Sequence, residues 1–191
     1  MSTALVVIDV QQSFQHRPFW REDDVPAFRE SLLALDAGCR ARGVPVIHVL
    51  HEAPGSGGPF DPASGHVRLM DWVTGGPEAL FRKRVHSALV ESGLREWLES
   101  RRIRRLVVTG IRTEQCCETT ARHASDLGYQ VDFVTEATLT FPMKHASGRV
   151  YSPAEIRERT ELVLAGRFSR IVTAAEALAG VDEAKAGAGQ R

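Results

Sequence analysis

Short apolar runs rich in β-branched residues recur along this chain, and segments with helical periodicity separate them. The clearest runs lie at 4–10, 44–50 and 106–108. Continuous hydrophobicity, in place of strict alternation, indicates strands that are covered on both faces, as in a parallel sheet. Strands that alternate with helices predict a three-layer α/β/α (Rossmann-like) domain with a mostly parallel sheet of five or six strands.

The remaining elements follow the same alternation. We expect further strands near 79–84, 130–135 and 171, and helices over 24–43, 87–100, 113–128, 152–166 and 173–179. Two irregular segments, 53–76 and 136–152, interrupt the pattern, and loops of that length in a compact domain tend to be functional or flexible. With 191 residues, 43% of them hydrophobic, the chain is predicted to form one domain over 1–181 with a frayed tail at 182–191.

Charge and cysteine content narrow the classes of partner. The 24 basic and 24 acidic residues give a formal net charge of zero, which predicts neither a nucleic-acid partner nor a membrane partner. No apolar run approaches the length of a membrane-spanning helix, and the N-terminus lacks the basic and apolar regions of a signal peptide. Three cysteines, two of them adjacent, are not a disulfide framework. These features predict a cytoplasmic protein.

Cys116 lies where the strand at 106–108 turns into a helix. Gly110 is suited to the turn, and Thr113 is suited to the helix N-cap. A thiol in the first turn of a helix is near free backbone N–H groups and the positive end of the helix dipole, and both favour the thiolate. The carboxyl end of a strand is also where α/β sheets bind ligands. The alternative is a small structural residue at a tight junction, and the local pattern leaves both open.

Two charged residues are candidate partners of this thiol. Asp9 ends the apolar run 4–10, where an unpaired buried charge would cost several kcal/mol, so a cation or proton donor is expected beside it. Lysine occurs only at positions 83, 144 and 185 among the 24 basic residues, and an ammonium is compact enough to approach a carboxylate and a thiol together. The alternatives are that Asp9 caps the next turn and that Lys83 lies on a solvated edge strand.

Together these residues resemble the isochorismatase-like cysteine hydrolase superfamily over about residues 4–179. The resemblance is carried by the following elements in order: Ile8-Asp9-Val10-Gln11-Gln12-Ser13-Phe14, Lys83 ahead of Ser87 and Leu94, the segment from Thr109 to Arg122, and the segment from Phe168 to Leu178.

The resemblance implies a catalytic triad of Asp9, Lys83 and Cys116. It implies a non-proline cis peptide at Ile111-Arg112, which would help to form an oxyanion hole from Arg112 and Cys116, and it implies a homodimer or homotetramer. In the family pattern the nucleophile falls three residues after the threonine, which selects Cys116. The adjacent Cys117 lies about 100° further round a helix and is expected to pack inward, while Cys39 is expected in the core.

The substrate is expected to be a small molecule. Phe14 and the segments 53–76 and 136–152 are predicted to wall its pocket. The candidate substrate-binding residues are Gln11, Phe14, Trp72, Arg112 and Phe141, of which Arg112 is suited to bidentate binding of a carboxylate.

No cofactor and no metal are expected. The zinc-bearing nicotinamidase relatives place an Asp and two His after the second strand, and the segment 48–52, with His48 and His51, does not reproduce that pattern.

The leading functional prediction is hydrolysis of a C–N bond in a small amide or carbamoyl-like compound through a thioester on Cys116. One alternative is isochorismatase-type hydrolysis of a vinyl ether, which needs an acid at Asp9 but no thiol. The other is a non-catalytic small-molecule-binding protein on the same scaffold.

Overall fold

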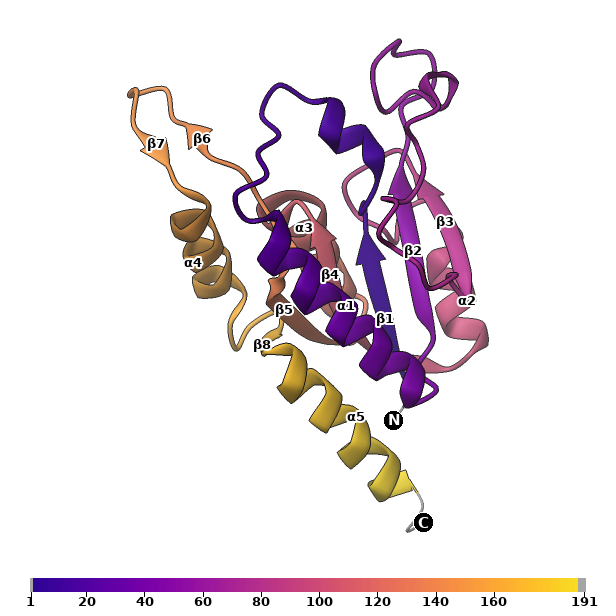
Figure 1. Cartoon of the computed structure of the whole chain (residues 1–191). Helices are drawn as coiled ribbons and strands as arrows, with labels where there is room; N and C mark the ends of the chain where they lie inside the picture. The colour runs from indigo at the N-terminus through magenta and orange to yellow at the C-terminus, as the bar shows by residue number, and fades with distance from the viewer. Residues whose placement is uncertain (1, 189–191) are drawn as a thin grey trace.

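A six-stranded parallel sheet forms the centre of the computed structural model, which describes residues 2–188 (Figure 1). The strands are β1 (Ser2–Ile8), β2 (Val46–His51), β3 (Ala79–Lys83), β4 (Ile103–Ile111), β5 (Gln130–Leu139) and β8 (Arg170–Ile171). Their order is β3-β2-β1-β4-β5-β8, and every neighbouring pair is parallel. The predicted three-layer fold is confirmed.

The order of the sheet reverses between β1 and β4. The chain builds β2 and β3 on one side of β1, then returns to place β4, β5 and β8 on the other side. Neighbouring connections at such a point lead to opposite faces, and this leaves a crevice outside the carboxyl ends of the strands. The fold therefore directs attention to the residues that follow β1 and β4.

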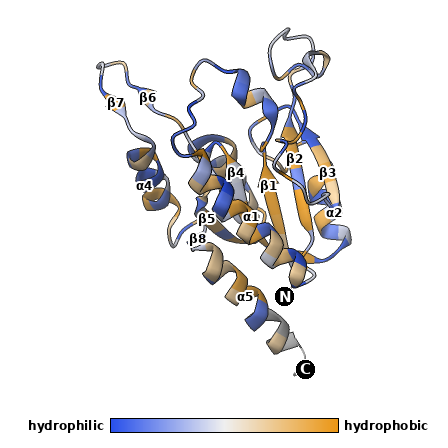
Figure 2. Cartoon of the chain, in the orientation of Figure 1, coloured by the Kyte–Doolittle hydropathy of each residue, from blue (hydrophilic) through white to orange (hydrophobic). Residues whose placement is uncertain are grey.

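Two separate hydrophobic cores cover the faces of the sheet. Alternate residues of β1, Leu5 and Val7, face the core beneath α1 (Val25–Ala41) and α5 (Ala174–Ala188). Val6 and Ile8 face the other core, beneath α2 (Leu94–Ser100), α3 (Glu118–Asp126) and α4 (Pro153–Leu164). Because both faces are covered, the strands are apolar throughout, and Figure 2 shows this apolar centre between more polar helix surfaces.

Gly110 is required by the close packing of β1 against β4. Its φ is +125°, and a Cβ at this position would overlap the carbonyl oxygen of Ile8 and lie 2.7 Å from the Ile8 nitrogen. Real side chains cannot occupy that space without moving backbone. The glycine therefore lets the end of β4 lie directly against the end of β1.

Two predicted helices begin differently from expectation. The helix expected from residue 87 begins only at Leu94, because Ser92 accepts a hydrogen bond from Leu94 N–H and Gly93 adopts a left-handed φ of +82°. The helix expected after Thr113 opens with a π-helical turn, Thr113–Cys117. Thr113 is not its cap, since its hydroxyl donates to Thr138 Oγ1 at 2.8 Å.

Two further differences lie in the C-terminal part. Within 136–152, β6 (Met143–Lys144) and β7 (Val150–Tyr151) pair antiparallel in an arm that projects from the body (Figure 1). The last helix does not end at 179 but continues to Ala188, through most of the segment that is expected to be a frayed tail. Alanine favours the helix in this segment, and Asp182 pairs with Arg42 at 2.9 Å. Positions 189–191 lie outside the described residues.

Within residues 2–188, none of the helices has the length and apolar character needed to cross a bilayer.

Candidate active site

Asp9 lies at the carboxyl end of β1 and is completely buried. Its φ of 54° is in the left-handed region, which Asp tolerates better than most residues. The backbone is held there because Asp9 N–H donates to Val49 O at 2.7 Å. This bend ends the strand and leaves the carboxylate beneath the crevice, as the pattern of an apolar run ending in Asp predicts.

Lys83 reaches the same point from β3, across the intervening strand β2. Its side chain is fully buried, and Nζ donates to Asp9 Oδ2 at 2.7 Å and to Cys116 Sγ at 3.3 Å. The neighbouring Arg82 and Arg84 point the other way and pair with Glu52 at 3.6 and 3.1 Å. The alternation of side chains along β3 thus separates one buried ammonium from two surface guanidinium groups.

Cys116 is carried by the π-helical turn that follows β4. The carbonyl oxygen of Arg112 accepts hydrogen bonds from the N–H groups of Gln115 and Cys117, both at 3.2 Å, which fixes the turn. The peptide bond between Ile111 and Arg112 is cis, as the family resemblance implies. Cys117 is completely buried in the core with Ala121 and Ala124, while Cys116 retains 7% exposure beside the cavity.

The three side chains therefore converge although 74 positions separate Asp9 from Lys83 and 33 separate Lys83 from Cys116. Burial raises the pKa of Cys116 to about 12; the nearby Asp9 carboxylate adds to the rise, and Lys83 opposes it. Burial alone would lower the pKa of Lys83, but the charge of Asp9 and then that of Cys116 outweigh it, so this pKa is raised. At neutral pH these shifts keep Cys116 as a thiol and Lys83 as an ammonium.

One oxygen of the Asp9 carboxylate has no hydrogen-bond partner among residues 2–188. Oδ2 accepts from Lys83, whereas Oδ1 is buried and has no hydrogen-bond donor among residues 2–188. A buried carboxylate oxygen without a donor is uncommon and costly. The group is therefore suited to accept a proton from a neighbouring thiol.

A cavity of about 520 Å³ opens above these groups. It is lined by Asp9, Phe14, Arg17, Phe19, His51, Ala53, Ser56, Gly58, Pro59, Phe60, His86, Arg112, Gln115 and Cys116. Of the five residues predicted to bind substrate, Phe14 and Arg112 line it. The first part of the segment 53–76 forms one wall, as expected.

Gln11, Trp72 and Phe141, which are also predicted to bind substrate, do not line this cavity. The Gln11 amide is buried and is used structurally, since it donates to His51 O at 3.0 Å and accepts from His51 N–H at 2.7 Å. Trp72 packs edge-on against Phe28, next to the core beneath α1. The segment 136–152 also contributes no side chain to the lining.

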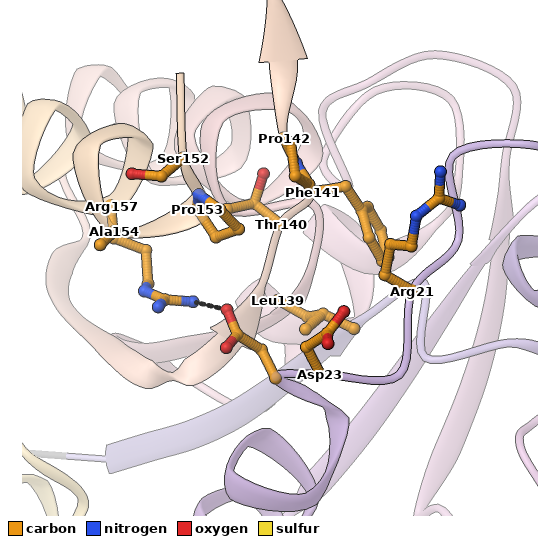
Figure 3. A pocket seen from close by; sticks show the side chains of 11 residues that line it. Arg21, Asp23, Leu139, Thr140, Phe141, Pro142, Ser152, Pro153, Ala154 and Arg157 are labelled. Atoms are coloured by element: carbon orange, nitrogen blue, oxygen red, sulfur yellow. Dashed lines mark hydrogen bonds and ion pairs between the residues drawn. The ribbon is translucent and has the colours of Figure 1, made fainter. Parts of the chain in front are cut away.

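Phe141 belongs to a second, smaller cavity of about 270 Å³ (Figure 3). Its ring lies 5.2 Å from that of Phe19, so it supports an aromatic side chain of the larger cavity from behind. The smaller cavity lies where the beginnings of α1 and α4 meet, and Arg157 crosses it to pair with Asp24 at 3.0 Å. None of the three converging side chains reaches it.

Several lining residues had no clear signal in the sequence, among them Phe19, His51 and Phe60. The sequence suggests for His51 only a comparison with metal ligands, together with His48. In the structure its Nδ1 lies 3.4 Å from Lys83 Nζ, and burial, followed by Lys83, lowers its pKa. His48 points into the protein on the other side of β2 and is 1% exposed. Within 2–188, no group of three or more His, Cys, Asp or Glu side chains is arranged to hold a metal ion.

Comparison with known proteins assigns this chain to a class of hydrolases. The isochorismatase domain model matches residues 3–150, and the chain belongs to the isochorismatase family. It is 27% identical to the isochorismatase family protein YrdC of Bacillus subtilis, over 89% of this chain and 91% of that protein. It is 30% identical to Nicotinamidase 3 of Arabidopsis thaliana, over 88% of this chain and 83% of that protein.

The fold is also similar to that of a solved isochorismatase-family protein from Chromobacterium violaceum. The two superpose with a TM-score of 0.86 and are 27% identical, with 95% of this chain and 94% of that chain covered. Similarity over almost the whole length of both chains shows that the two proteins share one overall fold.

Proposed function

We propose that this hydrolase cleaves a C–N bond of a small amide or carbamoyl-like compound, with Cys116 as nucleophile and Asp9 and Lys83 as its partners. The observation that carries the proposal is the convergence of a thiol, a carboxylate with one free oxygen and a buried ammonium at the floor of one cavity. The similarity to Nicotinamidase 3, whose name describes an amidase, supports it.

The first half of the reaction forms a thioester. With the Cys116 pKa raised to about 12, the thiol is protonated at rest and needs a base. Asp9 Oδ1 takes this proton as Sγ bonds to the substrate carbonyl carbon, and Lys83 stabilises the negative charge that moves from carboxylate to sulfur. The carbonyl oxygen becomes an oxyanion, for which the backbone N–H groups of Arg112 and Cys116 are the proposed donors. The C–N bond then breaks, and the amine leaves with the proton from Asp9.

The second half releases the product. A water molecule attacks the thioester carbonyl while Asp9 accepts one of its protons. Collapse of the tetrahedral intermediate breaks the C–S bond, and the thiolate regains its proton from Asp9. The products are an amine or ammonia and an acid, and the three side chains return to their resting protonation states.

Hydrolysis of a vinyl ether is the less favoured alternative. That reaction requires a carboxylic acid at Asp9 that protonates the substrate, and it does not use a thiol. The site instead places the Cys116 thiol beside the Lys83 ammonium that contacts Asp9, and vinyl-ether hydrolysis has no role for that thiol. The site chemistry therefore favours nucleophilic attack on an amide.

A screen of small primary amides and carbamoyl compounds, read by ammonia release, tests the proposal. Wild-type protein should release ammonia from at least one class, and Cys116→Ala should lose this activity while remaining folded by circular dichroism. Cys117→Ala is the matched control, because it removes a thiol one position away that lies in the core. Equal activity of Cys116→Ala and wild type on the same substrate would reject the nucleophile.

A further inference from the structure

The cavity carries an excess of positive charge. Its one carboxylate among the described residues, Asp9, is neutralised by Lys83 at the floor. Arg112 is also compensated, because its Nη2 lies 2.8 Å from Glu114 Oε1. Arg17 differs from both: it lines the cavity, it is exposed, and no ion pair within 2–188 involves it. A free guanidinium therefore lies on the outer part of this cavity.

Local hydrogen bonds hold the backbone of Arg17 in place. Its N–H donates to Phe14 O at 3.0 Å, and its carbonyl accepts from Trp20 N–H at 3.0 Å. The guanidinium lies over the ring of Phe19, with Cζ 5.5 Å from the ring centroid. Contact with an aromatic face restricts the side chain while leaving its N–H groups available to a ligand.

Three aromatic rings line the same cavity as this guanidinium and the thiol. Phe14 and Phe60 meet edge-to-face with centroids 5.0 Å apart, and Phe14 and Phe19 are 6.4 Å apart. All three rings line the cavity. Such a wall favours a flat, apolar body in the ligand, with polar groups only at its two ends.

We propose that the substrate is a small amide with an apolar or aromatic body and a carboxylate at the end away from the scissile bond, and that Arg17 selects it. The proposal rests on the proposed function, because it assumes that the scissile carbonyl lies at Cys116. A guanidinium binds a carboxylate through two parallel N–H donors, which fixes orientation as well as charge. Neutral analogues of the same shape would lose this contact and keep the aromatic ones.

A matched set of amides tests the selection. The substrates are 4-carbamoylbenzoate, its methyl ester and benzamide. The variants are Arg17→Gln and Arg17→Lys. The control is Arg95→Gln, which removes an exposed arginine of α2 outside the cavity. Wild type should prefer the acid over the ester by about tenfold in kcat/KM, equivalent to one Arg–carboxylate contact. Arg17→Gln should remove this preference by slowing the acid alone, Arg17→Lys should keep part of it, and Arg95→Gln should match wild type.

Ionic strength gives a second readout, because salt screens the attraction between the exposed Arg17 guanidinium and the substrate carboxylate. The preference of wild type for the acid should shrink as salt is raised, and that of Arg17→Gln should not change. Equal use of acid and ester by wild type, or an equal loss on both in Arg17→Gln, would overturn the proposal.

Labelling of Cys116 separates this proposal from the proposed function, since it needs no turnover. N-(4-carboxyphenyl)maleimide and N-phenylmaleimide react with thiols and differ only in a distal carboxylate, and peptide mapping identifies Cys116 as the labelled residue. Arg17→Gln should lower the ratio of the two labelling rates at least threefold, and Arg95→Gln should leave it unchanged. An unchanged ratio in Arg17→Gln would overturn the anion site. A changed ratio without ammonia release from any amide would instead reject the amidase function.

Discussion

The floor of the cavity and its wall are built from different parts of the fold. The floor consists of the side chains of Asp9, Lys83 and Cys116, at the ends of β1 and β3 and in the turn after β4, and these are 0–7% exposed. The wall comes from irregular segments, chiefly around Phe14–Phe19 and 53–60. Strand ends are fixed by the hydrogen bonds of the sheet, whereas loops are fixed by contacts specific to each sequence. Chemistry should therefore depend on the floor and specificity on the wall.

Replacing Asp9 with Asn should give the largest loss of activity. Asparagine is similar in shape but cannot take the Cys116 proton, so kcat should fall about 10³-fold, within the usual range for loss of a general base. Steady-state ammonia release measures this. Asp36→Asn is the control, because Asp36 pairs with Arg40 on α1, away from the cavity, and this variant should retain full activity. Activity of Asp9→Asn within tenfold of wild type would contradict the proposed base.

Replacing Lys83 with Met tests how far the floor depends on its buried ion pair. Asp9 would remain buried without its cation, and the free energy of unfolding should fall by about 3–5 kcal/mol. Urea denaturation at pH 7.5 measures it. Arg84→Met, on the exposed side of the same segment, should change stability by less than about 0.5 kcal/mol.

The double variant Asp9→Asn with Lys83→Met sharpens this test, because it removes both charges. Much of the lost stability should return, since no uncompensated buried charge remains. If Lys83→Met is as stable as Arg84→Met, the pair contributes nothing to the fold.

His48, a buried residue of β2, should make the free energy of unfolding depend on pH in the acidic range. Burial lowers the pKa of His48 from its ordinary 6.5 to about 4, and neither ring nitrogen has a partner within the described part of the chain. Between pH 6.5 and pH 4, His48 therefore binds a proton in the unfolded chain but not in the folded chain. The contribution of neutral His48 to the free energy of unfolding is complete above pH 6.5 and declines as the pH falls towards 4. It should amount to about 2 kcal/mol between pH 7.5 and 5.

The variant His48→Leu should lower the acid sensitivity by that amount without weakening the protein at pH 7.5. Urea denaturation of wild type and variant at both pH values gives the comparison. Identical pH dependence in the two proteins would show that His48 is not the group responsible.

Phe60→Ala and Trp72→Ala distinguish wall from core. Phe60 lines the cavity, so its truncation should raise KM about tenfold, the loss of roughly 1.4 kcal/mol of apolar contact, with little change in kcat. Trp72 packs on Phe28 beside the core, so its truncation should lower stability and leave KM unchanged. A raised KM in Trp72→Ala, with an unchanged KM in Phe60→Ala, would show that Trp72 and not Phe60 contacts the substrate.

The residues of the floor are visible in the sequence as candidates because each breaks a strong pattern, and the family resemblance joins them into one triad. Asp9 interrupts an apolar run, Lys83 is rare among arginines, and Cys116 follows a buried strand at a helix start. The sheet could be predicted for a related reason, because short, continuous apolar runs are typical of strands that are covered on both faces. A helix N-terminus favours a thiolate, but burial and the nearby Asp9 raise the pKa of Cys116, so the resting group is a thiol.

The wall could not be predicted in the same way. Trp72 and Phe141 are aromatic residues in irregular segments, which suggests a place in the pocket, but either side of such a segment can face the core. The side that does so depends on tertiary contacts such as those of Trp72 with Phe28 and of Phe141 with Phe19. The late start of α2 has a similar origin, since Ser92 and Gly93 form a local turn that competes with the helix.

The central claim is that Cys116 becomes acylated with Asp9 as its base, and mass spectrometry of acid-quenched reactions tests it most directly. With an amide that the ammonia screen identifies, the intact mass of wild type should rise by the mass of the acyl group, and peptide mapping should locate it on Cys116. Asp9→Asn should accumulate little of this adduct in the same time. Product formation with no adduct under any quench, an adduct on another residue, or equal acylation of Asp9→Asn would contradict the account.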